Sequence, residues 1–316
     1  MRIDFSKNTK FIYYTGQILR LCIPGFYYQS QLKKRLERAK NNPSLQKRLE
    51  YYNKLNENFE IPNEAKSIQE FRKTEKKKTY FFDLIAPLRY FKSDLKISYL
   101  FGDITSVPNR PAVLKSRPIE GKNENSILMK LNKVRHFIFV NDTIAFKDKK
   151  DMAVWRGKAY RDHRKVFVKK YYNHPLCNIG QTNTKYDLSV PWQKEKLSLK
   201  KQLEYKFILS IEGNDVASNL KWVMSSNSLS MMSKPKYETW FMEGTLIPNV
   251  HYVLLKDDYS DLEEKIRYYT EHTDEALAII KNANAFVGEF LDEETEALLS
   301  LLVLEKFFKQ SSQIPS

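Results

Sequence analysis

Hydrophobic and polar positions follow two different patterns along the chain. Up to residue 78 the pattern is helical, with an aromatic and aliphatic stretch at Phe11–Tyr28 and a basic run at Gln31–Lys40. From Thr79, short apolar runs separated by turn residues predict strands. These runs are Tyr80–Phe82, Ile97–Phe101, Ala112–Leu114, Phe137–Val140 and Ala153–Trp155.

The alternation continues to the C-terminus. Leu203–Ile211 is predicted to be helical, and Ser228–Met232 and His251–Leu255 to be strands. Apolar residues at three- and four-residue steps then predict three helices: Leu262–Thr270, Glu275–Phe290 and Glu293–Phe308. Strands spaced by helices indicate an α/β fold. A charged turn at residues 147–151 suggests a domain boundary near residues 145–152.

Length and composition limit the class of protein. A chain of 316 residues with 42% hydrophobic residues can fold as two domains or one large one. No apolar run is long enough to span a membrane, and no cleavage site follows the first apolar stretch. Two distant cysteines, Cys22 and Cys177, favour a reducing compartment over a disulfide framework. We therefore expect a cytoplasmic protein.

Charge is distributed unevenly. The net formal charge is +15, but residues 1–80 alone carry a net +10 and residues 257–306 a net −10. This asymmetry disfavours a nucleic-acid partner and favours a protein that turns one basic face toward an anionic surface. The first forty residues fit a segment in the headgroup layer of the inner face of the cytoplasmic membrane. The alternative is an ordinary pair of helices with solvated lysines.

Several catalytic motifs are missing from the sequence. It has no HExxH, GxGxxG, GxxxxGK[ST] or GxSxG motif, and its five histidines and two distant cysteines do not form a four-ligand zinc motif. No Asp-x-Asp pair is present to hold a divalent ion. We therefore expect neither a metal nor a resident cofactor.

Cations follow one predicted strand. Ala153–Gly157 ends in Arg156 and Gly157, with Arg161 and Arg164 close behind. A guanidinium at a strand end, beside a backbone that can approach a ligand closely, suits a diphosphate. A surface arginine is the alternative reading.

A second turn carries similar chemistry. The preceding helix or strand is predicted to end at Gly213, and a new helix begins near Ala217. Ser218 and Lys221 then lie at a helix N-terminus, which is suited to an anion. A plain capped helix would look the same. Glu238, after the strand at Ser228–Met232, could accept hydrogen bonds from a ribose.

Together these segments resemble glycosyltransferase family 90, in its bacterial lipopolysaccharide branch. The resemblance runs from about residue 80 to about 290 and rests on five motifs in order: Lys115-Ser-Arg-Pro-Ile119, Trp155-Arg-Gly157, Glu212-Gly-Asn-Asp-Val-Ala-Ser218, Glu238-Thr-Trp240 and Leu246-Ile-Pro-Asn-Val-His-Tyr-Val253. It implies a GT-B-like architecture of two Rossmann-type domains facing across a cleft, and inverting, metal-independent transfer from a UDP-sugar.

The resemblance also implies a division of labour. Residues 1–78 would form the basic helical segment, 79–148 an acceptor half, 149–290 a UDP-sugar half, and 291–316 a helix crossing back to the first half. Arg156 and Lys221 would offset the diphosphate charge, with Gly157, Arg164, Gly213, Ser218 and Glu238 around the nucleotide. Lys115 and Arg117 could bind an acceptor's phosphate or carboxylate, or tie loops together.

The catalytic base is where the sequence departs from its relatives. Animal O-glucosyltransferases keep an aspartate a few residues after their counterpart of Lys115-Ser116, whereas this chain has Glu124-Asn-Ser-Ile-Leu128. We rank Asp103 first, because it follows a predicted strand, then Glu124 and Asp142.

The expected function is transfer of a hexose from a UDP-sugar to a lipopolysaccharide or lipooligosaccharide core or a similar glycan. A protein or capsular-polysaccharide acceptor is one alternative. A non-catalytic basic protein on a degenerate transferase fold, binding membrane or nucleic acid, is the other.

Overall fold

The computed structural model describes residues 2–3, 9–40 and 42–315, and the chain forms two compact units. Unit 1 combines Met1–Phe5, His136–Pro235 and Glu243–Glu289, and unit 2 combines Ser6–Arg135, Lys236–Met242 and Phe290–Ser316. Neither unit is continuous in sequence, whereas the sequence analysis expected only the last helix to return to the first half. The basic N-terminal helices and the last helix both belong to unit 2.

Unit 1 contains a five-stranded parallel sheet. Its order is β13-β11-β10-β8-β9, which places β8 and β10 side by side at the centre. A separate parallel pair joins β1 to β7. The strand bounds are β1 (Arg2–Ile3), β7 (Phe139–Val140), β8 (Lys150–Gly157), β9 (Cys177–Gln181), β10 (Tyr205–Leu209), β11 (Leu229–Met232) and β13 (Val253–Leu254).

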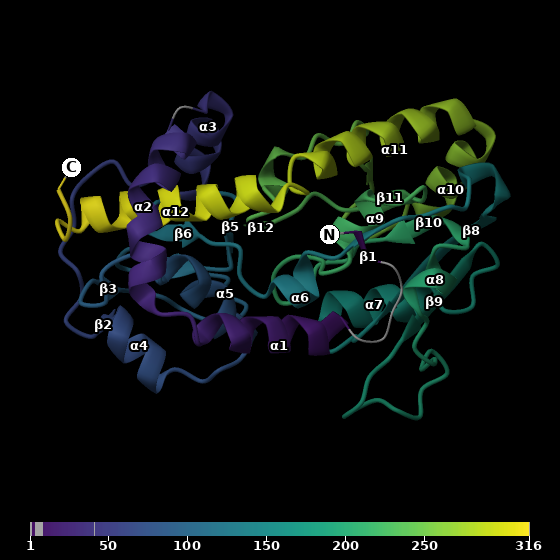
Figure 1. Cartoon of the computed structure of the whole chain (residues 1–316). Helices are drawn as coiled ribbons and strands as arrows, with labels where there is room; N and C mark the ends of the chain where they lie inside the picture. The colour runs from purple at the N-terminus through teal and green to yellow at the C-terminus, as the bar shows by residue number, and fades with distance from the viewer. Residues whose placement is uncertain (1, 4–8, 41, 316) are drawn as a thin grey trace. The chain divides into compact units, whose positions relative to one another are not determined.

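Side chains alternate between the two faces of this sheet. Phe207 and Trp155 join a large apolar cluster with α7, α10 and α11, whereas Ile208 and Val154 join a smaller cluster with α9. Figure 1 shows α10 and α11 beside the strands. The helices of this unit are η1 (Phe146–Asp148), α7 (Asp162–Tyr171), α8 (Leu199–Gln202), α9 (Leu220–Met224), η2 (Glu243–Thr245), α10 (Leu262–Glu271) and α11 (Thr273–Gly288).

Unit 2 is mainly helical and is organised around α12. This helix is apolar on nearly all sides and packs against α2, α3 and α5, as Figure 1 shows for α2. Its helices are α1 (Thr9–Leu21), α2 (Gly25–Lys40), α3 (Pro43–Tyr52), α4 (Ile68–Thr74), α5 (Thr79–Leu88) and α12 (Glu293–Gln310). α6 (Lys133–His136) lies at the sequence boundary between the units.

Three small two-stranded sheets complete unit 2. β2 pairs with β3 and β5 with β12 in antiparallel fashion, whereas β4 and β6 are parallel. The strands are β2 (Lys66–Ser67), β3 (Lys96–Ile97), β4 (Ala112–Leu114), β5 (Ser116–Pro118), β6 (Ser126–Leu128) and β12 (Tyr237–Thr239). Among the described residues, no helix is both long enough and apolar enough to cross a bilayer.

The α/β class and the parallel sheet agree with the sequence pattern, but two predicted elements are wrong. Tyr80–Phe82 was predicted to be a strand but lies in helix α5. The prediction fails because a short, continuously apolar run has no period that distinguishes a strand from a helix. Leu203–Ile211 contains strand β10, all five residues of which are buried. A central strand covered on both faces is continuously apolar, so it lacks the alternation that marks a strand.

Candidate functional site

The strand order of unit 1 identifies one place on the sheet for a ligand. The chain passes from β8 outward to β9 and then returns to β10 on the other side of β8. Loops after β8 and β10 therefore leave in opposite directions, and ligands of open α/β sheets bind at the carboxyl ends of such strands. We call residues 157–164 and 210–215 the switch-point loops.

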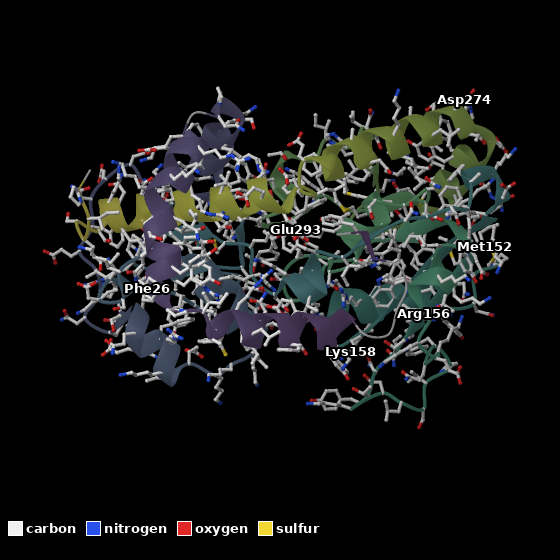
Figure 2. The ribbon with its side chains drawn as sticks, viewed as in Figure 1. Phe26, Met152, Arg156, Lys158, Asp274 and Glu293 are labelled. Carbon is white, nitrogen blue, oxygen red and sulfur yellow. The ribbon has the colours of Figure 1, made fainter. Side chains whose placement is uncertain are left out.

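Glycine is required at the end of β8 by its neighbour. A Cβ on Gly157 would lie 2.6 Å from Cζ2 of Trp155, whose indole is buried. The Arg164 guanidinium lies 5.4 Å from the centre of the same Trp155 ring. The Trp-Arg-Gly motif therefore packs an indole beneath the start of the first switch-point loop. Figure 2 labels Met152, Arg156 and Lys158, which follow one another along β8 and out of its carboxyl end.

Arg164 ties the two switch-point loops together. It donates hydrogen bonds to the carbonyl oxygen of Lys158 at 3.0 Å, and to those of Ile211 at 2.5 Å and Glu212 at 2.8 Å. A Cβ on Gly213 would lie 3.3 Å from Arg164 Nη2, so glycine leaves room for the guanidinium. Two predicted donor-site residues, Arg164 and Gly213, are thus brought together with Gly157 at the switch point.

Two further polar side chains lie on these loops: Arg161, which the sequence analysis noted behind the same strand, and His163, which it did not single out. Arg161 Nε donates to Asn214 Oδ1 at 2.6 Å, and His163 Nε2 lies 2.8 Å from the Glu212 carbonyl oxygen. Arg161 and Lys158 are exposed, so their charge is available to an anion. The position of His163, directly before Arg164 and shortly after a predicted strand, is the signal that could have indicated it.

Arg156 is placed differently from the expectation. Its guanidinium lies across β9, where it donates to the Asn178 carbonyl oxygen and to Asn178 Oδ1, both at 2.6 Å, and to the Glu195 carbonyl oxygen at 3.3 Å. Burial lowers the pKa of this guanidinium. Arg156 shares its face of the sheet with Val154, because residues two apart on a strand point the same way. This arrangement anchors β8 to β9.

Lys221 lies in the first turn of α9, as expected, but its ammonium is buried. Lys221 Nζ forms an ion pair with Glu243 Oε1 at 2.5 Å, and both side chains are almost fully buried. The preceding Ser218 is half-buried. The helix has five residues and no side-chain N-cap. The Glu243 carboxylate thus takes up the charge that the sequence analysis assigned to a diphosphate.

Glu238 belongs to unit 2 and not to the sheet of unit 1. β12 pairs with β5 so that Glu238 and Arg117 are direct cross-strand partners. Arg117 Nε donates to Glu238 Oε1 at 2.7 Å, and the Tyr51 hydroxyl also donates to this carboxylate. Both side chains are buried, and Arg117 also donates to the carbonyl oxygens of Tyr51 and Ser126. The pair therefore joins β5 and β12 to the end of α3.

Lys115 and Asp103, which the sequence analysis named separately for acceptor binding and as the base, form a second ion pair of unit 2. Lys115 Nζ binds Asp103 Oδ1 at 2.5 Å; the lysine side chain is 1% exposed and the aspartate side chain 25% exposed. Asp103 follows Gly102, whose φ of +118° favours glycine in the turn. A partly exposed carboxylate held by a buried ammonium is oriented and can still reach a ligand.

The other candidate bases are in contrasting environments. Glu124 is exposed in the loop before β6. Asp142, in unit 1, is buried against Lys149 at 2.7 Å and also accepts hydrogen bonds from the backbone amides of Ile144 and Asn227. These contacts make Asp142 a structural residue of the β7–η1 loop.

A buried network in unit 2 was missed by the sequence analysis. Glu296 of α12 binds Arg48 at 2.7 Å and Lys130 at 2.8 Å, and it accepts a hydrogen bond from Trp240 Nε1 at 2.6 Å. The Tyr52 ring stacks on Trp240, with centroids 3.9 Å apart. Glu296 is one of three acidic residues in the first turn of α12, a pattern typical of an exposed helix N-terminus, so the sequence gives no sign that it is buried.

No group of three or more histidine, cysteine or acidic side chains in the described part of the chain could hold a metal ion.

Comparison with known proteins identifies the family of the chain. Residues 125–308 match the model of the family described as glycosyl transferase family 90. "O-glucosyltransferase LpsA" of Dichelobacter nodosus is 43% identical over 291 residues, which are 90% of this chain and 91% of that protein. Human "Protein O-glucosyltransferase 3" is 28% identical over 53% of this chain and 34% of its own length. "Protein O-glucosyltransferase 2" of Danio rerio is 29% identical over 43% of this chain and 28% of its own length. Because the family model spans more than half of the chain and one relative matches nearly all of it, the chain belongs to glycosyl transferase family 90.

Proposed function

We propose that this glycosyltransferase moves a hexose from a UDP-sugar to a lipopolysaccharide or lipooligosaccharide core, with inversion and without a metal ion. Glucose is the first hexose to test, because the bacterial relative is named an O-glucosyltransferase and matches 91% of its own length. The two units would act as the two halves of a GT-B-like enzyme, with the donor on unit 1 and the acceptor on unit 2.

The switch-point loops carry the donor half of this proposal. Their exposed cations, Lys158 and Arg161, and the clamp made by Arg164 follow the carboxyl ends of β8 and β10, the position at which open α/β sheets commonly bind ligands, which supports this proposal. A diphosphate matches these cations in charge and can accept several charge-assisted hydrogen bonds. Neutralising the departing UDP in this way would replace the divalent ion that other transferases use.

The position of Arg164 changes the role proposed for the predicted residues. Arg164, Gly157 and Gly213 would shape the site and fix the loops, and Lys158 and Arg161 would reach the diphosphate. Arg156 and Lys221 are proposed to act on the donor through the backbone that they hold, because their charged groups already contact Asn178 and Glu243. Ser218 is kept as a candidate contact to the nucleotide. Glu238, in the unit 2 ladder, would position the acceptor loops through Arg117.

The acceptor half of the proposal centres on Asp103. In an inverting transfer the acceptor hydroxyl oxygen forms a bond to the anomeric carbon while the bond from that carbon to the UDP oxygen breaks. The hydroxyl proton passes to the base. Asp103 would be that base, oriented by Lys115, whose buried ammonium also places a positive charge near an acceptor phosphate or carboxylate. Glu124 is the second candidate.

A protein acceptor is the competing proposal within the same reaction class. Two animal relatives are named protein O-glucosyltransferases, although this chain covers about a third of their length or less. A capsular polysaccharide is the third candidate acceptor, and a non-catalytic protein on a transferase fold is the alternative outside the class.

Product analysis separates these candidates. The full chain is incubated with UDP-glucose and, in parallel, with core oligosaccharide, capsular polysaccharide or folded peptide domains, and the products are identified by mass spectrometry. The proposal expects a hexose added to the core oligosaccharide. Transfer to peptides or capsule alone would overturn the acceptor assignment, and absence of transfer from every UDP-hexose would overturn the donor assignment.

A further inference from the structure

The corner between α1 and α2 of unit 2 exposes an unusual set of side chains. Five large apolar residues are 39% to 73% exposed within ten positions of the sequence. They are Ile18, Leu19, Ile23, Phe26 and Tyr27. We call this set the corner patch. Apolar residues that gather on an exposed corner mark an interaction site more often than isolated ones do.

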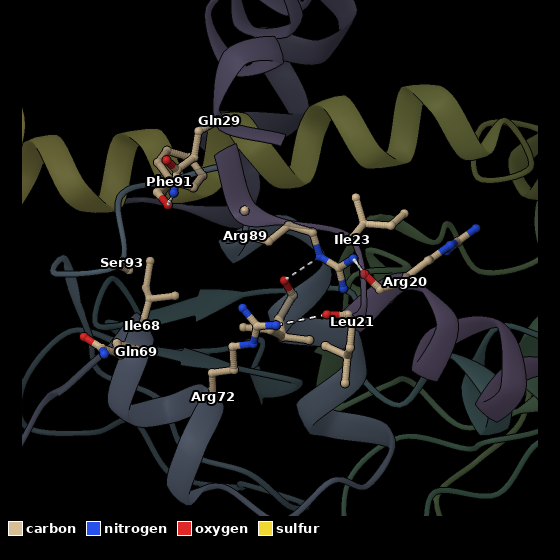
Figure 3. Close-up of a pocket in the computed structure, with 12 residues that line it drawn as sticks. Arg20, Leu21, Ile23, Gln29, Ile68, Gln69, Arg72, Arg89, Phe91 and Ser93 are labelled. Carbon is tan, nitrogen blue, oxygen red and sulfur yellow. Dashed lines mark hydrogen bonds between the residues drawn. The ribbon is translucent and has the colours of Figure 1, made fainter. Parts of the chain in front are cut away.

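An arginine-lined cavity lies directly beside the corner patch. Its volume is about 110 Å³, and its walls come from the end of α1, the start of α2, α4 and α5. Figure 3 shows Arg72 and Arg89 reaching the end of α1 from two sides, with the side chain of Arg20 extending away from them. Ile23 belongs to both the corner patch and the cavity wall, so the two features are continuous.

Arg72 and Arg89 both hold the end of α1, but not every N–H donor of the two guanidinium groups is used for this. Arg72 Nη2 donates to the Leu21 carbonyl oxygen at 2.9 Å, and Arg89 Nη1 donates to that of Arg20 at 2.8 Å. These bonds cap the C-terminus of α1, where the helix dipole favours cations. Arg89 Nη2, however, is buried and makes no hydrogen bond within the described part of the chain. A buried donor without an acceptor is costly, and the guanidinium that carries it belongs to a residue of the cavity wall.

Charge around the corner patch selects the kind of partner. Arg20, Lys33, Lys34, Arg72 and Lys73 are all exposed on α1, α2 and α4. Apolar side chains next to exposed cations match the two layers of an anionic bilayer surface, in which phosphates overlie acyl chains.

We propose that the corner patch inserts into the headgroup layer of an anionic phospholipid bilayer and that the cavity between Arg72 and Arg89 holds the phosphate of one of its lipids. Arg20 would lie along the surface and contact a neighbouring headgroup. This proposal rests on the proposed function in one respect, because a lipid-linked acceptor would be presented to the enzyme at the membrane. It goes beyond that function by naming the surface of the protein that contacts the bilayer.

An exposed cysteine in the corner between α1 and α2 allows insertion into the bilayer to be detected with a fluorescent label. Cys22 is exposed at the corner between Leu21 and Ile23, whereas Cys177 is buried and burial raises the pKa of its thiol to about 12. A polarity-sensitive maleimide dye therefore labels Cys22 selectively in the full chain. With vesicles of phosphatidylcholine and phosphatidylglycerol, dye emission is expected to shift to the blue and the protein to sediment with the vesicles. Pure phosphatidylcholine vesicles should give little of either, and 1 M salt should weaken the binding because it shortens the Debye length to about 3 Å.

Variants assign the effect to the corner. Leu19→Gln/Phe26→Gln is expected to weaken vesicle binding about tenfold or more, and Arg20→Gln about fivefold, the loss of one surface cation. Arg89→Gln tests the cavity, but it also removes a hydrogen bond that caps α1, so weaker binding by this variant alone could come from a disturbed helix end. Arg20→Gln and the apolar double variant keep that cap and therefore decide the test. Leu277→Gln and Lys281→Gln on α11 of unit 1 are matched controls and should bind as the wild type does.

The outcomes are distinguishable from those of the proposed function. Turnover on a water-soluble core oligosaccharide should be unchanged in the corner variants. Wild-type protein that transfers hexose but ignores anionic vesicles would overturn the docking proposal alone. Corner variants that bind vesicles as well as the wild type, or controls that lose binding equally, would do the same. Vesicle binding without any transfer would instead overturn the proposed function.

Discussion

Arg164 Nη2 lies 3.3 Å from the point that a Cβ on Gly213 would occupy, and the same nitrogen donates to the carbonyl oxygen of Ile211. The guanidinium thus rests against the backbone that follows β10, where a side chain on residue 213 would make the guanidinium shift by a few tenths of an ångström. This contact explains why an arginine after β8 and a glycine after β10 occur in one chain. They fix the distance between the switch-point loops.

Removing this contact should weaken donor binding. Arg164→Gln loses charge-assisted hydrogen bonds to the loop carbonyls, each contributing roughly 1.5–3 kcal/mol, so UDP affinity should fall about ten- to hundredfold. Calorimetric titration with UDP measures the effect. Lys165→Gln, the neighbouring exposed residue of α7, is the matched control and should bind UDP normally. Equal UDP affinity in the two variants would contradict the assignment of the donor site.

Lys221 should affect stability more than it affects UDP contacts. Lys221→Met removes the buried cation that Glu243 binds, and breaking a buried ion pair costs roughly 3–5 kcal/mol of unfolding free energy. Replacing both partners, as Lys221→Met/Glu243→Leu, should recover much of that loss. Urea denaturation of the two variants measures it. A stable Lys221→Met variant that has lost UDP binding would return the lysine to the diphosphate.

Asp103→Asn keeps the shape of the side chain and removes its basicity. If Asp103 takes the acceptor proton, turnover should fall roughly 10²–10⁴-fold while UDP affinity is retained. The exposed Glu124 provides the comparison through Glu124→Gln, measured in the same steady-state assay. Near-normal turnover in Asp103→Asn with loss of activity in Glu124→Gln would move the base to Glu124.

The sequence allowed parts of the fold to be predicted where local patterns were strong. The strand at Ala112–Leu114 and the helix beginning at Glu293 follow from apolar period and turn residues, and the structure confirms both. β10 was mistaken for a helix because burial on both faces erased its alternation. The failure has a physical origin, since the two faces of a central strand are buried by helices distant in sequence.

The site could be predicted less completely than the fold. Gly157, Arg164 and Gly213 were identified from local motifs and do lie together. The partners of Arg117 and Lys221 could not be identified from the sequence, because Glu238 and Glu243 come close to them only through tertiary packing. A cation at a strand or helix end has the same sequence signature whether a ligand or a distant carboxylate neutralises it.

Chelation should leave activity intact. The sequence contains no Asp-x-Asp pair, and the proposed mechanism assigns neutralisation of the departing UDP to side chains on the switch-point loops. Hexose transfer in excess EDTA is therefore expected to match that in buffer alone. Activity that disappears with EDTA and returns with Mn²⁺ or Mg²⁺ would contradict the metal-independent mechanism.

The most direct test of the account is the NMR spectrum of the product formed from UDP-glucose and core oligosaccharide. The account predicts one new glucose whose anomeric proton shows the large coupling of a β-linkage, since inversion converts the α-linkage of the donor. A transferred glucose in the α-configuration, or release of free glucose with no transfer, would contradict it.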